Sequence, residues 1–397
     1  MKLLIAIPAL DEEESIAGII ERSLDARDHI LAHSPVTAVE ITVVSDGSTD
    51  RTVERARAFD DRIGLIVFPE NRGYGAAIQA AWQRSDAELL SFLDADGTCD
   101  PRFFADLCQA LVGDGADIAL GNRMTAESKM PLIRRCGNWA FAAMLSLFSS
   151  QSVHDTASGM RVLRRSCLRR LMPLPAGLHF TPAMSARAIL SEGLTITERD
   201  MPYHEREGRS KLRVARDGLR FLDVILRAAL LYRPSRPLGI AGVACLAVAV
   251  ALMLTPTASY FERGSVDGWM IYRFVVSDLA GTVGWLLLCA AYLTKKIVWV
   301  TLGGRNRKAR KTPLEVIFSS RWFWLLPFAC VAAGGLLVLP SFVELVATGA
   351  TYEHWSRFIA MSFLLSIAAI TAVTRAVDYC FELIADRLDF LEDLGER

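Results

Sequence analysis

The sequence predicts a mostly parallel α/β domain followed by an all-α membrane domain of four transmembrane helices. Two regions of unlike composition support this division. Residues 1–230 alternate short apolar runs with polar, helix-forming segments, whereas residues 238–376 contain long apolar stretches. The second region explains why the hydrophobic fraction of 52% and the mean hydropathy of +0.29 are high for a chain of 397 residues. The formal net charge of zero averages over both regions and excludes no class of function.

Five short apolar runs in the first region are predicted to be strands buried on both faces of a sheet, because they are continuous and too short for helices. Each is followed by a polar turn. Segments with helical patterning alternate with the runs, which predicts a doubly wound, parallel sheet. The predicted strands are Leu3–Ile7, Glu40–Ser45, Ile63–Phe68, Glu88–Leu93 and Asp117–Leu120.

Polar clusters follow the first four of these strands, at residues 11–15, 46–50, 70–75 and 94–97. Most of these residues have a local explanation, since acidic side chains compensate a helix dipole and Ser or Asp side chains cap helices. The ends of parallel strands nevertheless share one edge of the sheet, and open α/β sheets bind ligands at that edge. The convergence of four clusters therefore indicates a ligand site.

The stretch Asp94-Ala95-Asp96-Gly97 places two carboxylates one residue apart where a strand ends. Two acidic groups so close are costly unless a cation or hydrogen-bond donors lie between them. Oxygen ligands favour Mg²⁺ or Mn²⁺, and Mg²⁺ commonly binds one or two carboxylates together with substrate phosphates. The alternative for this pattern alone is a solvated acidic turn. Gly73 adds a loop whose backbone can approach a phosphate closely.

The order of these motifs resembles the family 2 glycosyltransferases of the GT-A fold, which has a Rossmann-like, mostly parallel sheet. The branch with the greatest resemblance contains the dolichyl-phosphate mannose synthases and the polyprenyl-phosphate glycosyltransferases. The resemblance covers roughly residues 1–230 and rests on five motifs in the same order. The motifs are Ile7–Glu13, Val44–Asp50, Asn71–Ala77, Asp94–Gly97 and His154–Arg161.

The resemblance implies a binding site for a nucleotide sugar. Glu12 and Asp46 would hold the ribose and the base, while Asp94 and Asp96 would hold the diphosphate and Mg²⁺ or Mn²⁺. Leu10 stands where an aromatic residue is common, and the residue before it lacks the usual hydroxyl, so the donor stays open between GDP- and UDP-sugars. The residues implied in nucleotide-sugar binding are Pro8, Ala9, Asp11, Glu12, Asp46, Gly73, Asp94, Ala95 and Asp96.

The acceptor implied by the resemblance is a polyprenyl phosphate, such as dolichyl or undecaprenyl phosphate. Arginine suits a phosphate because its planar fork donates hydrogen bonds in pairs. Asp155 would either orient the acceptor or hold Arg161. The residues implied in acceptor-phosphate binding are Arg123, Arg134, Asn138 and Ser210, and those implied in catalysis are Asp96, Asp155, Arg206 and Lys211.

Two basic segments have alternative interpretations. Residues 131–148 begin with adjacent arginines and are apolar on most faces, which is typical of a core helix with a basic start or of an interfacial helix whose arginines meet an anionic head group. Residues 203–212 are interpreted as a loop that folds over a diphosphate or as a juxtamembrane linker attracted to anionic lipid. The order of the motifs favours the first interpretation of this loop.

Residues 212–236 are predicted to form an amphipathic helix on the membrane surface, because apolar residues recur at helical spacing between arginines. Four apolar stretches follow, each close to the roughly 20 residues that a bilayer core requires. Asp278 and Pro327 interrupt two of them. The four stretches are Leu238–Leu254, Phe274–Leu293, Trp322–Pro340 and Phe358–Thr374.

Basic residues decide the predicted orientation in the membrane. The connection at residues 294–321 is rich in Lys and Arg, whereas the other connections between the stretches hold few. The positive-inside rule therefore places this loop and both termini in the cytoplasm, as expected of a multi-pass protein of the cytoplasmic (inner) membrane. The lack of a signal-peptide pattern and eight Cys residues without a Cys-X-X-Cys pair agree with a reducing compartment.

The sequence thus predicts a catalytic domain at residues 1–211, a juxtamembrane helix at 212–236, a membrane domain at 237–376 and an acidic tail at 377–397 that forms a short helix. The predicted activity is metal-dependent, inverting transfer of a hexose, mannose or glucose, from a GDP- or UDP-sugar to a membrane polyprenyl phosphate. One alternative is a membrane polysaccharide or glycolipid synthase, although the chain lacks the Gln-X-X-Arg-Trp motif usual there. A non-catalytic membrane scaffold is the other. No nucleic acid partner is expected, and an oligomer is compatible with the sequence.

Overall fold

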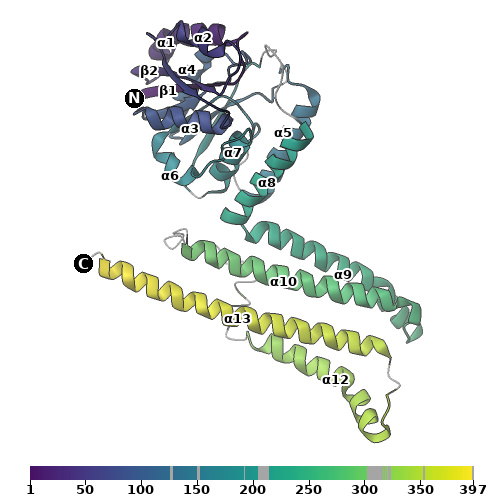
Figure 1. The fold of residues 1–397 in the computed structure, drawn as a ribbon. Coiled ribbons are helices and arrows are strands. Elements are labelled where there is room, and N and C mark those ends of the chain that lie inside the picture. The colour runs from purple at the N-terminus through teal and green to yellow at the C-terminus, as the bar shows by residue number, and fades with distance from the viewer. Residues whose placement is uncertain are drawn as a thin grey trace. The chain divides into compact units, whose positions relative to one another are not determined.

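The structure is a computed structural model that describes residues 1–125, 128–149, 153–191, 193–203, 214–301, 316, 318, 320, 323–351 and 354–395. The chain divides into two compact units, Met1–Tyr232 and Arg233–Arg397 (Figure 1). The first unit contains a sheet between two helical layers. The described residues of the second unit form helices and their connections.

A seven-stranded sheet forms the centre of the first unit, in the order β3-β2-β1-β4-β6-β5-β7. Neighbouring strands are parallel except for β6, which runs antiparallel to both β4 and β5. The predicted mostly parallel α/β fold is confirmed, and all five predicted strands are present. The strands are β1 (Lys2–Ala9), β2 (Ala38–Asp46), β3 (Gly64–Phe68), β4 (Leu89–Phe92), β5 (Ile118–Asn122), β6 (Arg161–Arg164) and β7 (Ile196–Asp200).

Strand β1 is an unbroken apolar run because both of its faces are covered. Leu3, Ile5 and Ile7 belong to the core on one side of the sheet, and Leu4 and Ala6 belong to the core on the other. All five side chains are fully buried. Since successive side chains of a strand point to opposite faces, a strand between two helical layers must be apolar at each position.

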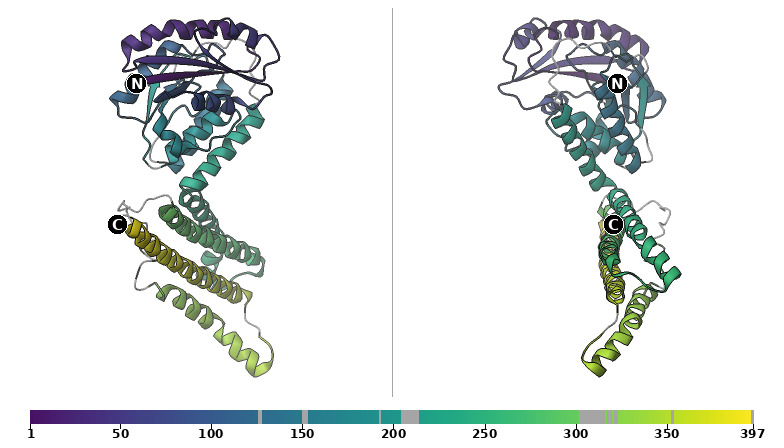
Figure 2. Two further views of the ribbon diagram at one scale, coloured as in Figure 1. Left: turned by 60° about the vertical axis from the view of Figure 1, so that its left-hand side comes forward. Right: turned by 90° about the vertical axis from the view of Figure 1, so that its right-hand side faces the viewer.

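Helices α1, α2 and α4 contribute to the core on one face of the sheet, and α3, α5, α6, α7 and α8 contribute to the core on the other. Figure 2 shows α1 lying along one side of the sheet, away from α7 and α8. The helices are α1 (Ile16–His33), α2 (Thr52–Arg57), α3 (Tyr74–Arg84), α4 (Phe104–Gly113), α5 (Leu132–Phe148), α6 (Leu168–Leu171), α7 (Phe180–Leu190) and α8 (Val214–Tyr232), with short 3₁₀ turns η1 (Pro101–Phe103) and η2 (Arg165–Cys167).

The antiparallel strand β6 brings a further loop to the edge of the sheet where the predicted ligand site lies. Arg161 pairs with Phe92, so β6 begins beside the carboxyl end of β4. The loop that precedes β6 therefore lies next to Asp94 and Asp96. The sequence does not predict β6, because its apolar residues are only Val162 and Leu163 between two arginines.

Helix α8 belongs to the first unit and packs on α5 and α7. Its buried residues include Phe221, and Ile225, Ala228 and Ala229 belong to the core on this face of the sheet. Fully burying a side chain such as Ile225 stabilises the fold by about 1.5–3 kcal/mol. Leu219 and Leu222 are exposed on this helix. The predicted amphipathic helix is therefore present, with one apolar face packed on the α/β unit and further leucines at the surface.

The second unit contains four helices that are long and apolar enough to cross a membrane, within the described residues. Asp278 lies inside a continuous helix, and Pro327 lies in the first turn of another, where proline is tolerated. The predicted span at 322–340 begins just outside the described residues. The helices are α9 (Ser235–Arg263), α10 (Ile271–Thr301), α12 (Leu325–Thr348) and α13 (Trp355–Gly395), with the 3₁₀ turn η3 (Gly268–Met270) before α10.

The acidic tail is not a separate short helix. Helix α13 continues through it as one element, because no Gly or Pro interrupts the sequence between Trp355 and Leu394. Ion pairs fix this continuation to α10, since Lys296 contacts both Asp378 and Glu382. Figure 1 shows α13 and α10 side by side within the second unit.

Helices α9 and α10 approach closely where Gly242 faces Gly284. A Cβ atom added to Gly284 would lie 2.9 Å from the backbone oxygen of Gly242, and one added to Gly242 would lie 2.9 Å from the backbone oxygen of Gly284. Small residues at helix crossings allow backbones to pack in this way inside membranes.

Gly284→Ala should destabilise the second unit by about 1–3 kcal/mol, because the added methyl group overpacks the crossing with α9. Gly239→Ala, on α9 itself, is the matched control because a Cβ atom there meets nothing within 4 Å. The control should be neutral or slightly stabilising, by less than about 1 kcal/mol, since Ala is the better helix former. Thermal unfolding of the full chain in detergent distinguishes the two. Equal midpoints for both variants would contradict the tight crossing.

Candidate active site

A cavity of about 540 Å³ opens in the first unit at the edge of the sheet where a ligand site is predicted. The ends of β1, β2 and β4 supply carboxylates to it, while α5 and α8 supply arginines and apolar side chains. A hollow of similar size near His29 and Asp106 is lined by none of the predicted site residues. The predicted site residues that line the cavity are Pro8, Ala9, Glu12, Asp46, Gly73, Asp94, Ala95, Asp96, Arg123, Arg134 and Asn138.

Asp11 does not line the cavity and instead joins the loops after β1 and β2. Its Oδ1 atom accepts a hydrogen bond from the backbone N–H of Thr49 at 2.7 Å, and its own backbone N–H donates to Ser48 Oγ at 3.1 Å. Its φ of +48° is the left-handed conformation that Asp tolerates better than most side chains. Asp11 thereby sets the path of the chain just before Glu12, which does line the cavity.

Asp46 organises the loop after β3. Its Oδ1 atom accepts from the backbone N–H of Arg72 at 2.7 Å, and its Oδ2 atom accepts from the backbone N–H of Gly73 at 2.9 Å. Gly73 has a φ of +105°, and a Cβ atom there would lie 2.5 Å from the backbone oxygen of Ala176. The glycine is therefore required by the close approach of the segment before α7, in addition to any contact with a phosphate.

Asp94 and Asp96 are held differently although they stand one residue apart. Asp94 Oδ1 accepts a hydrogen bond from the hydroxyl of Tyr74 at 2.6 Å. Asp96 Oδ1 accepts from the hydroxyl of Thr98 at 2.7 Å and from its backbone N–H at 3.2 Å. Burial and the charge of Asp94 raise the pKa of Tyr74 well above its usual value, so the phenol keeps its proton and acts as a donor.

The residues at this edge fit a hard divalent cation that takes part of its coordination from a substrate. No group of three or more His, Cys, Asp or Glu side chains within the described part of the chain could hold a metal ion. Two aspartate carboxylates alone are the protein contribution typical of Mg²⁺ sites that are completed by substrate phosphates and water. Asp94 and Asp96 match that pattern.

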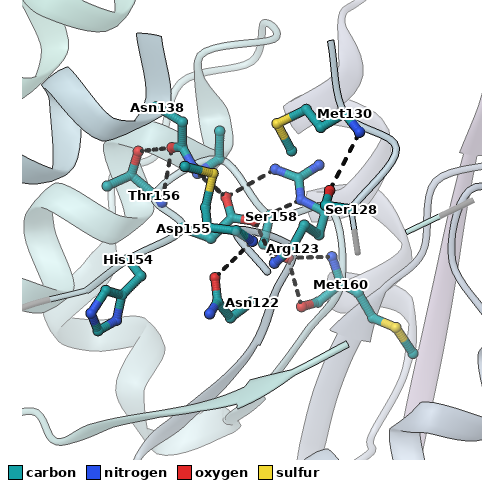
Figure 3. A network of polar contacts seen from close by, with 12 residues as sticks. Asn122, Arg123, Ser128, Met130, Asn138, His154, Asp155, Thr156, Ser158 and Met160 are labelled. Atoms are coloured by element: carbon teal, nitrogen blue, oxygen red, sulfur yellow. Dashed lines mark hydrogen bonds and ion pairs between the residues drawn. The ribbon is translucent and has the colours of Figure 1, made fainter. Parts of the chain in front are cut away.

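A buried network centres on Asp155, whose side chain is fully inaccessible to solvent (Figure 3). Arg123 donates to it twice, from Nε to Oδ2 at 2.7 Å and from Nη2 to Oδ1 at 2.9 Å. The Asn138 amide nitrogen donates to Oδ1 at 2.9 Å, and its oxygen accepts from Thr156. Burial disfavours the charged form of both Asp155 and Arg123. The attraction and hydrogen bonds between the two groups have the larger effect, so the pKa of Asp155 is lowered and that of Arg123 is raised.

Asp155 therefore holds Arg123, and Arg161 has other partners. The guanidinium of Arg161 is fully buried and donates to the backbone oxygens of Thr156 and Ser158 and to Ser185 Oγ. Burial lowers its pKa to about 10. Arg161 thus fixes the loop that precedes β6 rather than the carboxylate.

Arg206, Ser210 and Lys211 lie outside the described residues, so their predicted roles stay predictions. Sequence reasoning did not identify Tyr74, Glu198, Tyr203 or Arg220. The Glu198 carboxylate accepts the backbone N–H groups of His154 and Asp155, and the guanidinium of Arg123 lies 5.5 Å from the ring centre of Tyr203. Arg220 lines the cavity from α8. These contacts join residues that are far apart in the chain, so no local sequence pattern predicts them.

Comparison with known proteins agrees with this geometry. The sequence profile of glycosyl transferase family 2 matches residues 4–172. A dolichyl-phosphate hexose transferase of Haloferax volcanii is 33% identical over 219 residues, which cover 53% of this chain and 86% of that protein. The chain belongs to glycosyl transferase family 2. As a member of that family it is a glycosyltransferase, as the motif order predicts.

Three further proteins are also similar to the chain. The low-salt glycan biosynthesis hexosyltransferase Agl6 of Haloferax volcanii is 32% identical over 62% of this chain and 59% of its own length. A dodecaprenyl-phosphate galacturonate synthase of Rhizobium johnstonii is 24% identical over 76% of this chain and 86% of its own. A crystal structure of the glucosyl-3-phosphoglycerate synthase of Mycobacterium tuberculosis with Mn²⁺ and UDP-glucose superposes with a TM-score of 0.45 at 19% identity, over 57% of this chain and 79% of that one.

Asp155→Ala should destabilise the first unit by about 3–5 kcal/mol, because it leaves the Arg123 guanidinium buried without its partner. Asp114→Ala is the control, since Asp114 pairs with Arg199 at the surface and such pairs contribute at most about 1 kcal/mol. Thermal unfolding of the full chain in detergent measures both. An equal, small loss in the two variants would contradict the importance of the buried pair.

The same carboxylate predicts a pH dependence. Because the pKa of Asp155 is lower in the folded protein, its stabilising contribution is fully present above the unfolded pKa of about 4 and is lost as the pH falls through the lowered value. The difference in unfolding midpoint between the wild type and Asp155→Asn should therefore be constant above about pH 4 and should narrow as the pH is lowered further. A difference in midpoint that does not narrow at any pH below about 4 would contradict the linkage.

Proposed function

We propose that the chain transfers a hexose from a nucleotide sugar to a polyprenyl phosphate in the membrane. The observation that carries the proposal is one cavity that combines strand-end carboxylates with arginines and apolar side chains of α5 and α8. The presence of four helices apolar enough to span a membrane supports a lipid substrate. The printed names of two relatives, a dolichyl-phosphate hexose transferase and a dodecaprenyl-phosphate galacturonate synthase, support the same acceptor class.

The nucleotide sugar is proposed to bind at the ends of β1, β2 and β4. Glu12 and Asp46 would bind the ribose and the base, and Asp94 and Asp96 would hold Mg²⁺ or Mn²⁺ against the diphosphate. The bound cation would neutralise the charge that develops on the leaving nucleoside diphosphate. Asp46 already anchors the backbone of the loop at Gly73, so the base and diphosphate would meet a preformed surface.

The acceptor phosphate is proposed to bind Arg123 and Arg134, which line the same cavity. The amide of Asn138 is engaged by Asp155 and Thr156, so its contribution to the acceptor is to orient Arg123 through Asp155. Both oxygens of Asp155 contact Arg123, which supports the same orienting role for this carboxylate. Arg206, Ser210 and Lys211 are proposed to complete the site by adding donors to the phosphates.

The reaction needs no strong general base. The second pKa of a phosphate monoester is about 6, so the acceptor is largely a dianion near neutral pH. Its oxygen would form a bond to the anomeric carbon on the face opposite the diphosphate while the bond to the diphosphate oxygen breaks. This in-line displacement inverts the anomeric centre. Arg123 and Arg134 would hold the attacking phosphate, and no proton has to leave it.

The exposed apolar surface of α5 and α8 supports contact with a membrane. Leu132 and Trp139 of α5 and Leu219 of α8 are each more than two-thirds exposed. Such side chains beside basic residues are typical of helices that lie in the headgroup region. We propose that this unit, the connection at residues 294–321 and the C-terminal end of α13 lie on the cytoplasmic side, in accordance with the positive-inside rule.

Asp96→Asn should reduce transfer at least about 100-fold while the protein stays folded, because the amide still accepts from Thr98 but removes the charge that would hold the cation. Asp106→Asn, an exposed residue of α4, is the control. Lipid-linked sugar is measured with radiolabelled donor and a short polyprenyl phosphate. Turnover of the Asp96→Asn variant at the control's rate would exclude the assigned metal role.

Arg134→Ala should raise the KM for the polyprenyl phosphate about 10- to 100-fold, the value of one or two hydrogen bonds to a charged group, and leave the KM for the nucleotide sugar unchanged. Arg135→Ala, which removes a neighbouring arginine that does not line the cavity, should leave both constants unchanged. Equal effects of Arg134→Ala on both substrates would count against its role at the acceptor.

A further inference from the structure

Tyr74 is a partly buried residue at the start of α3, and its hydroxyl reaches Asp94 after the end of β4. The hydroxyl donates to Asp94 Oδ1 at 2.6 Å, and the residue lines the cavity. No role for this phenol follows from the sequence, because Tyr74 at the start of α3 and Asp94 after β4 meet only in the folded chain.

The ring of Tyr74 is locked by its surroundings. It packs edge-on against Phe92 and Phe180, at centroid distances of 6.3 and 6.4 Å. The two glycines beside it are equally confined. A Cβ atom at Gly73 would lie 2.5 Å from a backbone oxygen of the segment before α7, and one at Gly75 would lie 2.3 Å from the Pro175 oxygen. Two aromatic side chains therefore pack against the ring of Tyr74, and the backbone on either side of it passes close to the segment before α7.

Asp94 is constrained from its other side by the loop that precedes β6. A Cβ atom at Gly159 would lie only 2.0 Å from Asp94 Oδ2, so this loop passes against the carboxylate with room for glycine alone. With the Tyr74 hydroxyl on Oδ1 and Gly159 against Oδ2, the plane of the carboxylate is fixed from both sides.

We propose that Tyr74 is a positioning residue that holds the Asp94 carboxylate in the orientation in which it meets the cation and the donor diphosphate. The inference rests on the proposed function, in which Asp94 binds that cation. Without the phenol, the carboxylate can rotate, and the cation has to order it on binding. Groups that orient a metal ligand typically change metal affinity or activity about 10- to 100-fold when they are removed.

Tyr74→Phe tests this role because it removes one oxygen atom and keeps the ring packed against Phe92 and Phe180. The probe is Mn²⁺, titrated into the full chain in detergent with UDP or with GDP present, and free Mn²⁺ is followed by electron paramagnetic resonance. The dissociation constant for Mn²⁺ should rise about 10- to 100-fold in the variant. In the transfer assay, kcat should fall while the KM for the polyprenyl phosphate stays unchanged.

Tyr232→Phe is the matched control, because its hydroxyl donates to the backbone oxygen of Arg170 and does not line the cavity. It should leave the Mn²⁺ affinity unchanged. A double-mutant cycle tests whether the effect of Tyr74→Phe on Mn²⁺ affinity depends on the Asp94 carboxylate, which a purely structural role of Tyr74 would not require. In an Asp94→Asn background, Tyr74→Phe should have no further effect on the affinity for Mn²⁺.

The outcomes separate this inference from the proposed function. If Mn²⁺ affinity depends on Asp94 but Tyr74→Phe leaves it unchanged, the positioning role is overturned and the proposed function stands. An additional loss caused by Tyr74→Phe in the Asp94→Asn background would also overturn it, since the phenol would then act elsewhere. If the wild type with either nucleotide binds no Mn²⁺, both the metal assignment and the role of Tyr74 are overturned.

Discussion

The fully buried carboxylate of Asp155 needs partners that come from several elements around the candidate site. A buried charge is tolerated only when it is paired and hydrogen-bonded, and Asp155 meets this through Arg123 from the end of β5 and Asn138 from α5. Glu198 of β7 holds the backbone at the same point. The Asp155 carboxylate thus connects α5 to the sheet. Helix α5, which carries exposed apolar residues, therefore also helps to orient Arg123 at the cavity.

The carboxylates after β2 and β4 are held in another way, because they accept hydrogen bonds from uncharged groups nearby. Asp46 is held by two backbone N–H groups, Asp94 by a phenol and Asp96 by a threonine. These hydrogen bonds fix the position of each carboxylate. Preorganised groups of this kind need little rearrangement when charge develops on a substrate, which is the condition under which electrostatic stabilisation contributes most to a rate.

Much of the fold could be predicted from the sequence because strands covered on both faces and membrane-spanning helices leave continuous apolar runs. Strands β6 and β7 could not, since arginines flank the two apolar residues of β6 and charged residues make up much of β7. The carboxylates after β1, β2 and β4 were predictable as a group by their place at strand ends. Their partners, such as Tyr74 for Asp94, depend on contacts between distant segments that only the tertiary structure specifies.

Turnover tests the central claim most directly. A panel of GDP- and UDP-sugars is offered with a short polyprenyl phosphate in the presence of Mg²⁺, Mn²⁺ or a chelator, and lipid-linked sugar is measured. The account predicts a lipid-linked monosaccharide from one donor, with product lost on chelation. Polymer, or hydrolysis of the sugar nucleotide without any lipid-linked product, would contradict the assignment of a polyprenyl phosphate as the acceptor.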